Sequence, residues 1–305
     1  VTGGKSGEMH VNDKIVSFLN AFKNKDWSVS VGANATFVKN KIKNLPATMK
    51  ENGYISGSKK WLEGKSIYEF WLRQWHGVDP QTGDGLYVAD VSKYNQGNIG
   101  TGDGNITQSQ FDEYKKTVVT IDGKELTNSY TYAKYDFSGS SIPDVYGGFN
   151  VRVSYKNFDL AAVFSYQLGG QILDTNYATM MSMTEFGYAQ SPDLLKAWKQ
   201  AGDITEVPRI DNSAAHTTNI GQSYSTRWLT SSDYLNLRSV TIGYQLPKTW
   251  LSKVMLKSAR LNLTAENLFM LKARQGLNPM ANYSGVTYNE YMPSRNITLG
   301  LNVSF

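Results

Sequence analysis

The chain has 305 residues, no cysteine and a net charge of +5 that is spread along its length. The missing cysteines exclude a disulfide framework and a thiolate metal site, and without a basic block the sequence gives no sign of nucleic acid binding. Charged residues reach only 19%, against about 25% in a typical soluble protein, whereas aromatic residues reach 12%, with 19 tyrosines.

The N-terminal segment VTGGKSGEMHVND has no apolar core and no small-residue cleavage site, so it is not a signal peptide. The sequence also starts without Met in the middle of polar residues. We expect a mature product or a piece of a longer protein.

Alternation of apolar and polar residues predicts long antiparallel strands. The first is expected at 14–23. The second starts at Trp27 and extends for about 18 residues, against about 5–6 in ordinary globular sheets. An aromatic segment at 66–77 is also predicted to be a strand. Four more follow in the C-terminal half, at 146–156, 158–169, 224–246 and 258–271.

The last strand, 294–305, has the clearest alternation. Its apolar residues are separated by asparagine, threonine, glycine and serine, and they are Ile297, Leu299, Leu301, Val303 and Phe305. A half-buried strand of a soluble sheet has this pattern, and so does a transmembrane barrel strand with lipid on one side and water on the other.

Connections in the C-terminal half differ sharply in length. Tight turns are expected at 156–157 and 247–257, whereas 169–223 and 272–293 are long loops, the first with a short capped helix from Ser191. The alternation slips near Arg238, which indicates a β-bulge. Short turns at one end and long loops at the other are typical of transmembrane barrels.

Several segments in this order resemble the C-terminal part of the SusC/RagA family of TonB-dependent outer-membrane transporters of Bacteroidota. They are 77–88, 102–107, 147–174, 225–251, 261–269 and the closing NITLGLNVSF. The resemblance runs from about Asp26 to the end. It implies an all-β fold, an antiparallel transmembrane β-barrel with long extracellular loops. This chain would supply about eight or nine strands of a 22-strand type barrel. Residues 1–305 would be the C-terminal part of that barrel, with the plug domain absent from this chain.

The direction of the upstream strands stays open. If 128–137 is a strand, the turn at 23–26 is periplasmic and 79–127 is a long periplasmic connection. Without that strand, 79–145 is one extracellular loop and the turn at 23–26 is outside the cell.

The resemblance also implies a function: active import of a nutrient across the outer membrane of a Gram-negative bacterium. A glycan or oligosaccharide is the first candidate substrate and a peptide the second. The implied partners are a SusD-like surface lipoprotein, outer-membrane lipid, the barrel assembly machinery, and TonB-ExbB-ExbD through a missing N-terminal part. Phe305 resembles the terminal aromatic residue that such barrels present for assembly.

Two aromatic groups are candidate substrate-binding sites. Trp71 and Trp75, with Trp61 nearby, could stack on sugar rings, although an interfacial aromatic girdle explains them as well. The loop NYSGVTYNEY carries three tyrosines beside amide side chains, and these are Tyr283, Tyr288 and Tyr291.

No catalytic constellation is present, so we do not expect an enzyme. The three histidines lie far apart and are expected to be solvated (His10, His76 and His216). Carboxylates such as Asp159 and Glu266 sit on predicted polar faces with no evident partner. We expect no metal site and no cofactor. A calcium loop at Asp103 and Asn105 lacks the third ligand and the glycine of the EF-hand pattern, which favours a plain turn.

A second class of function is a secreted or surface all-β protein that binds carbohydrate with its aromatic residues. It would be recovered without detergent, whereas a membrane barrel would not.

Overall fold

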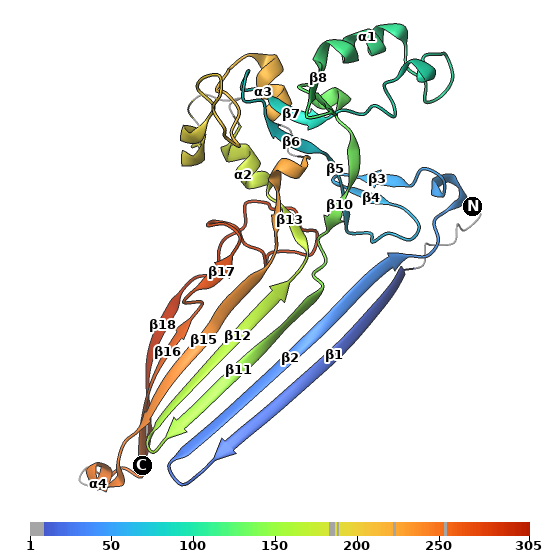
Figure 1. Cartoon of the computed structure of the whole chain (residues 1–305). Helices are drawn as coiled ribbons and strands as arrows, with labels where there is room; N and C mark the ends of the chain where they lie inside the picture. The colour runs from blue at the N-terminus through green and yellow to red at the C-terminus, as the bar shows by residue number, and fades with distance from the viewer. Residues whose placement is uncertain (1–8, 183–186, 188, 222–223, 253–254) are drawn as a thin grey trace.

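The computed structural model describes residues 9–182, 187, 189–221, 224–252 and 255–305 of the chain, with side chains described from Lys23 onward. Its main feature is one antiparallel sheet in which consecutive long strands pair side by side (Figure 1). Within the described ranges, no helix is long and apolar enough to cross a membrane. The long strands, in order across the sheet, are β1 (Met9–Lys23), β2 (Trp27–Ile42), β11 (Val145–Tyr155), β12 (Phe158–Leu168), β15 (Tyr234–Gln245), β16 (Ser258–Glu266) and β18 (Asn296–Ser304).

The short strand β17 (Met270–Lys272) also belongs to this sheet and pairs with the first residues of β15. The predicted strand at 258–271 is therefore two strands. They are separated near Asn267, whose φ of 52° lies in the left-handed region.

The strand register gives the sheet one apolar and one polar face. In one cross-strand row, Val31 pairs with Val151 and Val151 with Ala162, so apolar residues stand beside apolar residues. At the end of the sheet, Ile297 and Leu299 are 72% and 69% exposed. Apolar side chains along a whole exposed face fit contact with lipid, and the opposite polar face fits a hydrated lumen. The predicted all-β partial barrel is confirmed.

The bulge predicted near Arg238 is also confirmed. Val163 pairs with Ser239 and the next residue, Phe164, pairs with Leu237, so Arg238 is the extra residue on β15. The bulge keeps apolar residues on one face of β15 on both sides of the irregularity.

All three short connections lie at one end of the sheet (Figure 1). The Asn24 side-chain oxygen accepts hydrogen bonds from the amides of Asp26 and Trp27 and closes the first turn. The Lys156 amide donates to the Asp26 carbonyl over 2.9 Å, which joins the first turn to the second. The third connection, 246–257, contains α4 (Lys248–Leu251).

The three long connections, 43–144, 169–233 and 267–295, leave the opposite end. Each predicted alternative for the upstream strands is therefore right in one part and wrong in another. The first put the turn at 23–26 at the correct end but counted a barrel strand at 128–137, whereas the second gave 79–145 correctly as a loop but put the turn at the wrong end. The turn near 24–26 lies at the same end as the other turns, and 43–144 is a single excursion. The segment 66–77 contributes β5 (Glu69–Arg73) and β6 (Trp75–Val78) to small sheets outside the main one, because Phe70 and Leu72 are fully buried in the packing of the loops.

The long connections fold into a region of small sheets and short helices above the main sheet (Figure 1). One small sheet contains β3 (Tyr54–Ser56), β4 (Lys59–Trp61), β5 and β10 (Tyr135–Ser140), and a second contains β6, β7 (Gly85–Val88), β8 (Val118–Ile121) and β9 (Lys124–Thr127). A third pairs β13 (Gln171–Leu173) with β14 (Leu229–Ser231). The helices there are α1 (Gln108–Thr117), α2 (Thr175–Met180) and α3 (Ala214–Ile220).

Two predicted local structures can be located in this region. Ser191 caps a 3₁₀ helix, but the helix ends at Lys196 and is shorter than expected. The turn with Asp103 and Asn105 leads into α1, where Thr107 and Gln110 form a capping box. The residues that depart from the calcium-loop pattern thus begin a helix.

Three glycines on the polar face leave gaps that polar side chains from neighbouring strands cover, and they are Gly32, Gly243 and Gly300. The clearest gap is at Gly243, where a Cβ atom would lie 2.3 Å from the Arg260 guanidinium and 2.6 Å from the Asp159 carboxylate. Because this gap is open, Arg260 reaches across β15 and forms an ion pair of 2.6 Å with Asp159.

A fourth glycine, Gly147, fixes the approach of β2 and β11 on the apolar face. A Cβ atom there would lie 2.1 Å from the Asn34 carbonyl oxygen. The Tyr166 hydroxyl passes over this position and donates to the same oxygen over 3.0 Å. Only glycine therefore fits between the tyrosine and the neighbouring strand.

In the loop region, Lys59 is a buried cation. Its ammonium donates to the Tyr68 carbonyl over 2.9 Å and lies 3.1 Å from the centre of the Phe70 ring. Burial lowers the pKa of Lys59 to about 7, and the nearby Glu69 carboxylate opposes this shift only partly.

We predict that Gly147→Ala lowers the free energy of unfolding by roughly 1–3 kcal/mol, because the added methyl group meets backbone that cannot move aside. Denaturant unfolding in detergent, followed by tryptophan fluorescence, measures this. Gly102→Ala is the matched control, since its nearest neighbour is the flexible Asn105 side chain at 3.4 Å. Equal midpoints for Gly147→Ala and the wild type would contradict the prediction.

We predict that the stability of the loop region rises with pH between about 7 and 10.5, because in this window the unfolded chain binds a proton at Lys59 that the folded chain does not. Lys59→Met should flatten this dependence. The measurement is the urea midpoint of the loop tryptophans at pH 7 and pH 9.5, with Lys60→Met as the neighbouring control. The same pH slope in Lys59→Met and Lys60→Met would show that Lys59 is not its source.

Candidate functional site

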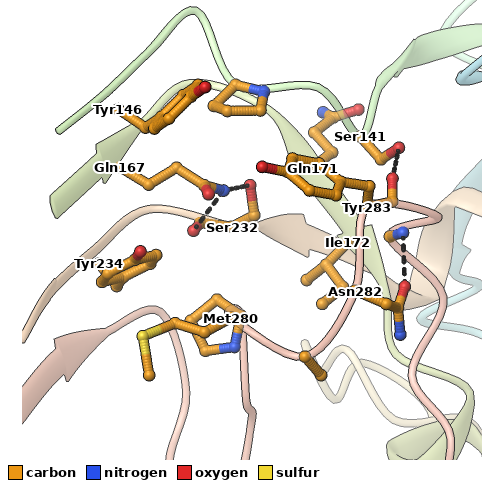
Figure 2. Close-up of a pocket in the computed structure, with 14 residues that line it drawn as sticks. Ser141, Tyr146, Gln167, Gln171, Ile172, Ser232, Tyr234, Met280, Asn282 and Tyr283 are labelled. Atoms are coloured by element: carbon orange, nitrogen blue, oxygen red, sulfur yellow. Dashed lines mark hydrogen bonds between the residues drawn. The ribbon is translucent and has the colours of Figure 1, made fainter. Parts of the chain in front are cut away.

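A small polar pocket lies where the three loops meet the polar face of the main sheet (Figure 2). Its floor is one cross-strand row in which Tyr146 of β11 pairs with Gln167 of β12, and Gln167 pairs with Tyr234 of β15. The cavity volume is about 200 Å³. The pocket therefore lies at the loop end of the face that suits a hydrated lumen.

Hydrogen bonds from each loop hold the pocket wall. The Gln167 side-chain amide donates to the Ser232 hydroxyl over 2.9 Å and to the Ser232 carbonyl over 3.2 Å. The Ser141 hydroxyl donates to the Tyr283 carbonyl over 2.8 Å, which joins the first loop to the third. The wall is thus built by residues that lie far apart in the sequence.

Glycine is required at two places in this wall. Gly170 has a φ of 78°, and a Cβ atom there would lie 2.9 Å from the Ser232 hydroxyl. Gly285 has a φ of 67°, and its Cβ would lie 2.2 Å from the Ser141 Cβ. The left-handed backbone and the close approach both exclude other residues without rearrangement.

The pocket offers hydrogen-bonding groups without charge. Its lining contains amides and hydroxyls, including those of Gln171, Asn282 and Tyr283, and no Asp, Glu, Lys, Arg or His. The side-chain oxygen of Gln171 is buried against Gly139 and has no hydrogen-bond partner among the described residues. This chemistry suits sugar hydroxyls or peptide amides and provides no general acid or base.

A larger hollow on the polar face continues from the pocket. It shares Tyr146 and Tyr234 with the pocket and has a volume of about 690 Å³. Its polar lining comes from four strands and includes Asn34, Asn150, Ser165 and Arg238. The bulge at Arg238 therefore brings a cation to the wall of this hollow.

Stacked aromatic and cationic side chains hold the loops above the pocket together. The Arg227 guanidinium lies 4.7 Å from the centre of the Trp75 ring and 4.3 Å from that of Trp228, which links the first two loops. Burial in this sandwich lowers the pKa of Arg227 to about 10. In the third loop, Arg274 lies 3.7 Å from the centre of the Tyr177 ring and forms an ion pair with Asp174.

The predicted substrate-binding residues do not form one site. Tyr283 lines the pocket, whereas Tyr288 borders a separate small hollow beside Asp174 and Tyr291 is 96% exposed. Trp71 is half-buried in β5, with its ring centre 4.9 Å from that of Phe137. Trp75 lies in a different sheet and packs against Tyr87 at 5.1 Å. Both tryptophans take part in the packing of the loops.

Sequence reasoning missed the remaining pocket residues, chiefly Tyr146, Gln167, Gln171, Ser232 and Tyr234. One usable signal was the Gly169-Gly170 pair directly after an alternating strand, which marks a sharp bend at the end of the sheet. The pairing of Tyr146 with Gln167 and Tyr234 depends on register, which the alternation alone does not give.

The expectation for one histidine is wrong. His216 is 7% exposed, and its Nε2 atom lies 2.8 Å from the Arg209 carbonyl oxygen. It is buried because α3 packs against Asp84 of the first long connection and Arg209 of the second, which form an ion pair of 3.0 Å. His76 is exposed, as expected. The His10 side chain lies outside the described residues.

Phe305 is 80% exposed at the end of β18, and its expected role in assembly stays a prediction. The described residues contain no group of three or more carboxylate and histidine side chains that could hold a metal ion.

No family model matches the chain. Two relatives from Formosa agariphila, each named a TonB-dependent receptor, are 26% and 24% identical over 99% and 94% of the chain. The chain spans only 28% and 31% of their lengths. The names of these relatives describe receptors and no enzymatic activity, in agreement with the prediction that the chain is not an enzyme.

The fold is shared with solved structures of the RagAB peptide transporter. One matches with a TM-score of 0.74 and 23% identity, and a second, the RagAB peptide importer in the "closed-closed" state, with 0.74 and 24%. The "open-open" state matches with 0.68 and 22%. Each match covers 98% of this chain and 29–30% of the solved chain. Taken with the named relatives, this shared fold supports the resemblance to SusC/RagA-like TonB-dependent transporters that the motifs indicated.

Proposed function

We propose that this chain forms the C-terminal part of an outer-membrane barrel that imports an uncharged, polar nutrient oligomer. The observation that carries the proposal is the pocket whose polar lining consists of uncharged amides and hydroxyls, at the loop end of a sheet whose other face is apolar. A ligand arriving between the extracellular loops would meet this pocket before the rest of the lumen.

An oligosaccharide is the first candidate substrate, because its hydroxyl groups match the donors and acceptors of Gln167, Gln171 and Ser232 and need no charged partner. A peptide is the second candidate. The support for it is that the RagAB proteins, which share the fold, are a peptide transporter, together with side-chain amides in the pocket that can pair with a peptide backbone.

The proposal includes the partners that the family resemblance implies. A SusD-like surface lipoprotein would cover the loop end, and TonB-ExbB-ExbD would act through a plug domain outside this chain. The barrel assembly machinery would insert the strands, with Phe305 as the terminal signal.

Deletion of the gene, followed by growth on defined oligosaccharides and defined peptides, tests both the function and the substrate class. Loss of growth on one class alone identifies the substrate. Unchanged growth on every nutrient of both classes would argue against import. Recovery of the native protein in the soluble fraction without detergent would favour a secreted carbohydrate-binding protein instead.

We predict that the double substitution Tyr146→Ala, Tyr234→Ala lowers uptake at limiting substrate by at least about tenfold, because each ring loses stacking area and a hydroxyl at the pocket floor. The measurement is uptake of the labelled nutrient, normalised to the amount of folded protein in the outer membrane.

Tyr291→Ala is the control, since this residue is fully exposed outside the pocket and should leave uptake unchanged. A loss of uptake in Tyr291→Ala with normal uptake in the double variant would place the substrate on the outer tyrosines instead.

A further inference from the structure

The outward face of β2 changes from apolar to basic at its loop end. Every second residue of the strand lies on this face, and from Trp27 to Phe37 all of them are apolar. The next two residues on the same face are Lys39 and Lys41. Lys43 follows directly after the strand. All three lysines are exposed. The basic strip, defined as Lys39, Lys41 and Lys43, therefore continues the apolar face where the strand leaves it.

The loops lie on the other side of β2, so they do not cover this strip. The Asn40 side-chain oxygen accepts hydrogen bonds from the Ser66 hydroxyl and the Ile67 amide, over 2.9 and 3.2 Å. Ile42 is 4% exposed beneath the same segment. Asn40 and Ile42 face the loops, and the alternating lysines leave the strand on its other side and stay exposed, with the Lys41 side chain running close to Gly64.

In the ion pairs that the described residues form, no carboxylate is the partner of a lysine of the basic strip. Two acidic residues of the adjoining segment, Glu63 and Glu69, are paired elsewhere. Glu63 lies 3.7 Å from the Lys50 ammonium, and Glu69 lies 3.7 Å from that of Lys65. Three neighbouring cations without a carboxylate partner among the described side chains attract an external anion.

An apolar groove of about 650 Å³ lies beside the strip on the same outward face. Its apolar lining comes from four strands of the main sheet and comprises Phe149, Tyr166, Leu168, Leu235 and Leu271. Asp233 and Lys272, which carry opposite charges, also line it.

Strand register relates the groove to the strip. Phe37 pairs with Val145, and Val145 pairs with Leu168, which lines the groove. Lys39 lies two residues beyond Phe37 on the same face. Because neighbouring strands are about 4.8 Å apart, the strip and the groove are separated laterally by roughly 10 Å. One amphipathic molecule can reach both.

We propose that this surface binds a phosphorylated, acylated glycolipid of the outer leaflet, with an acyl chain in the groove and its phosphate at the basic strip. The inference rests on the proposed outer-membrane location. Lysines next to an apolar membrane-facing band attract anionic lipid headgroups, and the ammonium group binds phosphate as a point charge. A soluble polyanion would use the strip and leave the groove empty.

The test uses the protein in detergent and native mass spectrometry. The probes are lipid A with its phosphates, the same glycolipid after dephosphorylation, and a phosphorylated disaccharide without acyl chains. We expect the triple variant Lys39→Gln, Lys41→Gln, Lys43→Gln to lose at least about tenfold in affinity for phosphorylated lipid A, because each lysine near an anionic headgroup contributes roughly fivefold. Its affinity for the dephosphorylated lipid should not change.

A second variant, Leu168→Ser with Leu271→Ser, should weaken both lipids. The matched control is Lys23→Gln, Lys25→Gln, Lys156→Gln, which removes the same charge at the turn end of the sheet and should bind like the wild type. Heat-modifiable migration on gels verifies that each variant is folded.

Undiminished binding of lipid A by the triple variant would overturn the proposal, and so would an equal loss in the turn-end control. Equally tight binding of the acyl-free disaccharide would exclude the groove. The two proposals can fail separately, because import does not depend on the lipid site. Normal nutrient uptake together with equal binding of the phosphorylated and dephosphorylated lipids would refute the lipid site and leave the import function standing.

Discussion

Backbone hydrogen bonding between neighbouring strands is the constraint on which the rest of this structure depends. In lipid, an unpaired amide or carbonyl has no water to bond, so each long strand must pair along its length. The pairing fixes the register, and the register decides which side chains share a face. Tyr146, Gln167 and Tyr234 meet in one row for this reason, and Lys39 continues the face of Phe37 for the same reason.

The main sheet could be predicted from the sequence because its strands are long and their period is regular. Alternation located β2, β11, β12 and β18 closely and even showed the extra residue at Arg238. At 66–77 the same reasoning found strand structure but not that it divides into β5 and β6, which lie outside the main sheet. There, alternating Phe70 and Leu72 are buried among other loops, and a strand of five residues in a loop has the same local pattern as part of a barrel strand.

The candidate site was harder to predict than the sheet. Aromatic residues attracted attention, yet Trp71 and Trp75 serve to pack the loops, and only Tyr283 of the proposed set lines the pocket. Most of the pocket is amide and hydroxyl, and such residues are common on every polar face. The contact between Ser141 and Tyr283 joins residues 142 positions apart, a distance over which periodicity carries no information.

The ion pair between Asp159 and Arg260 has a consequence for what travels along the polar face. It spans β15 only because Gly243 has no side chain, and it neutralises two charges at the turn end of the wall. From the lumen, this part of the wall acts as a dipole, whose field falls off faster with distance than that of a single charge. Under the proposed import function, a charged cargo would therefore meet little net attraction or repulsion from this pair.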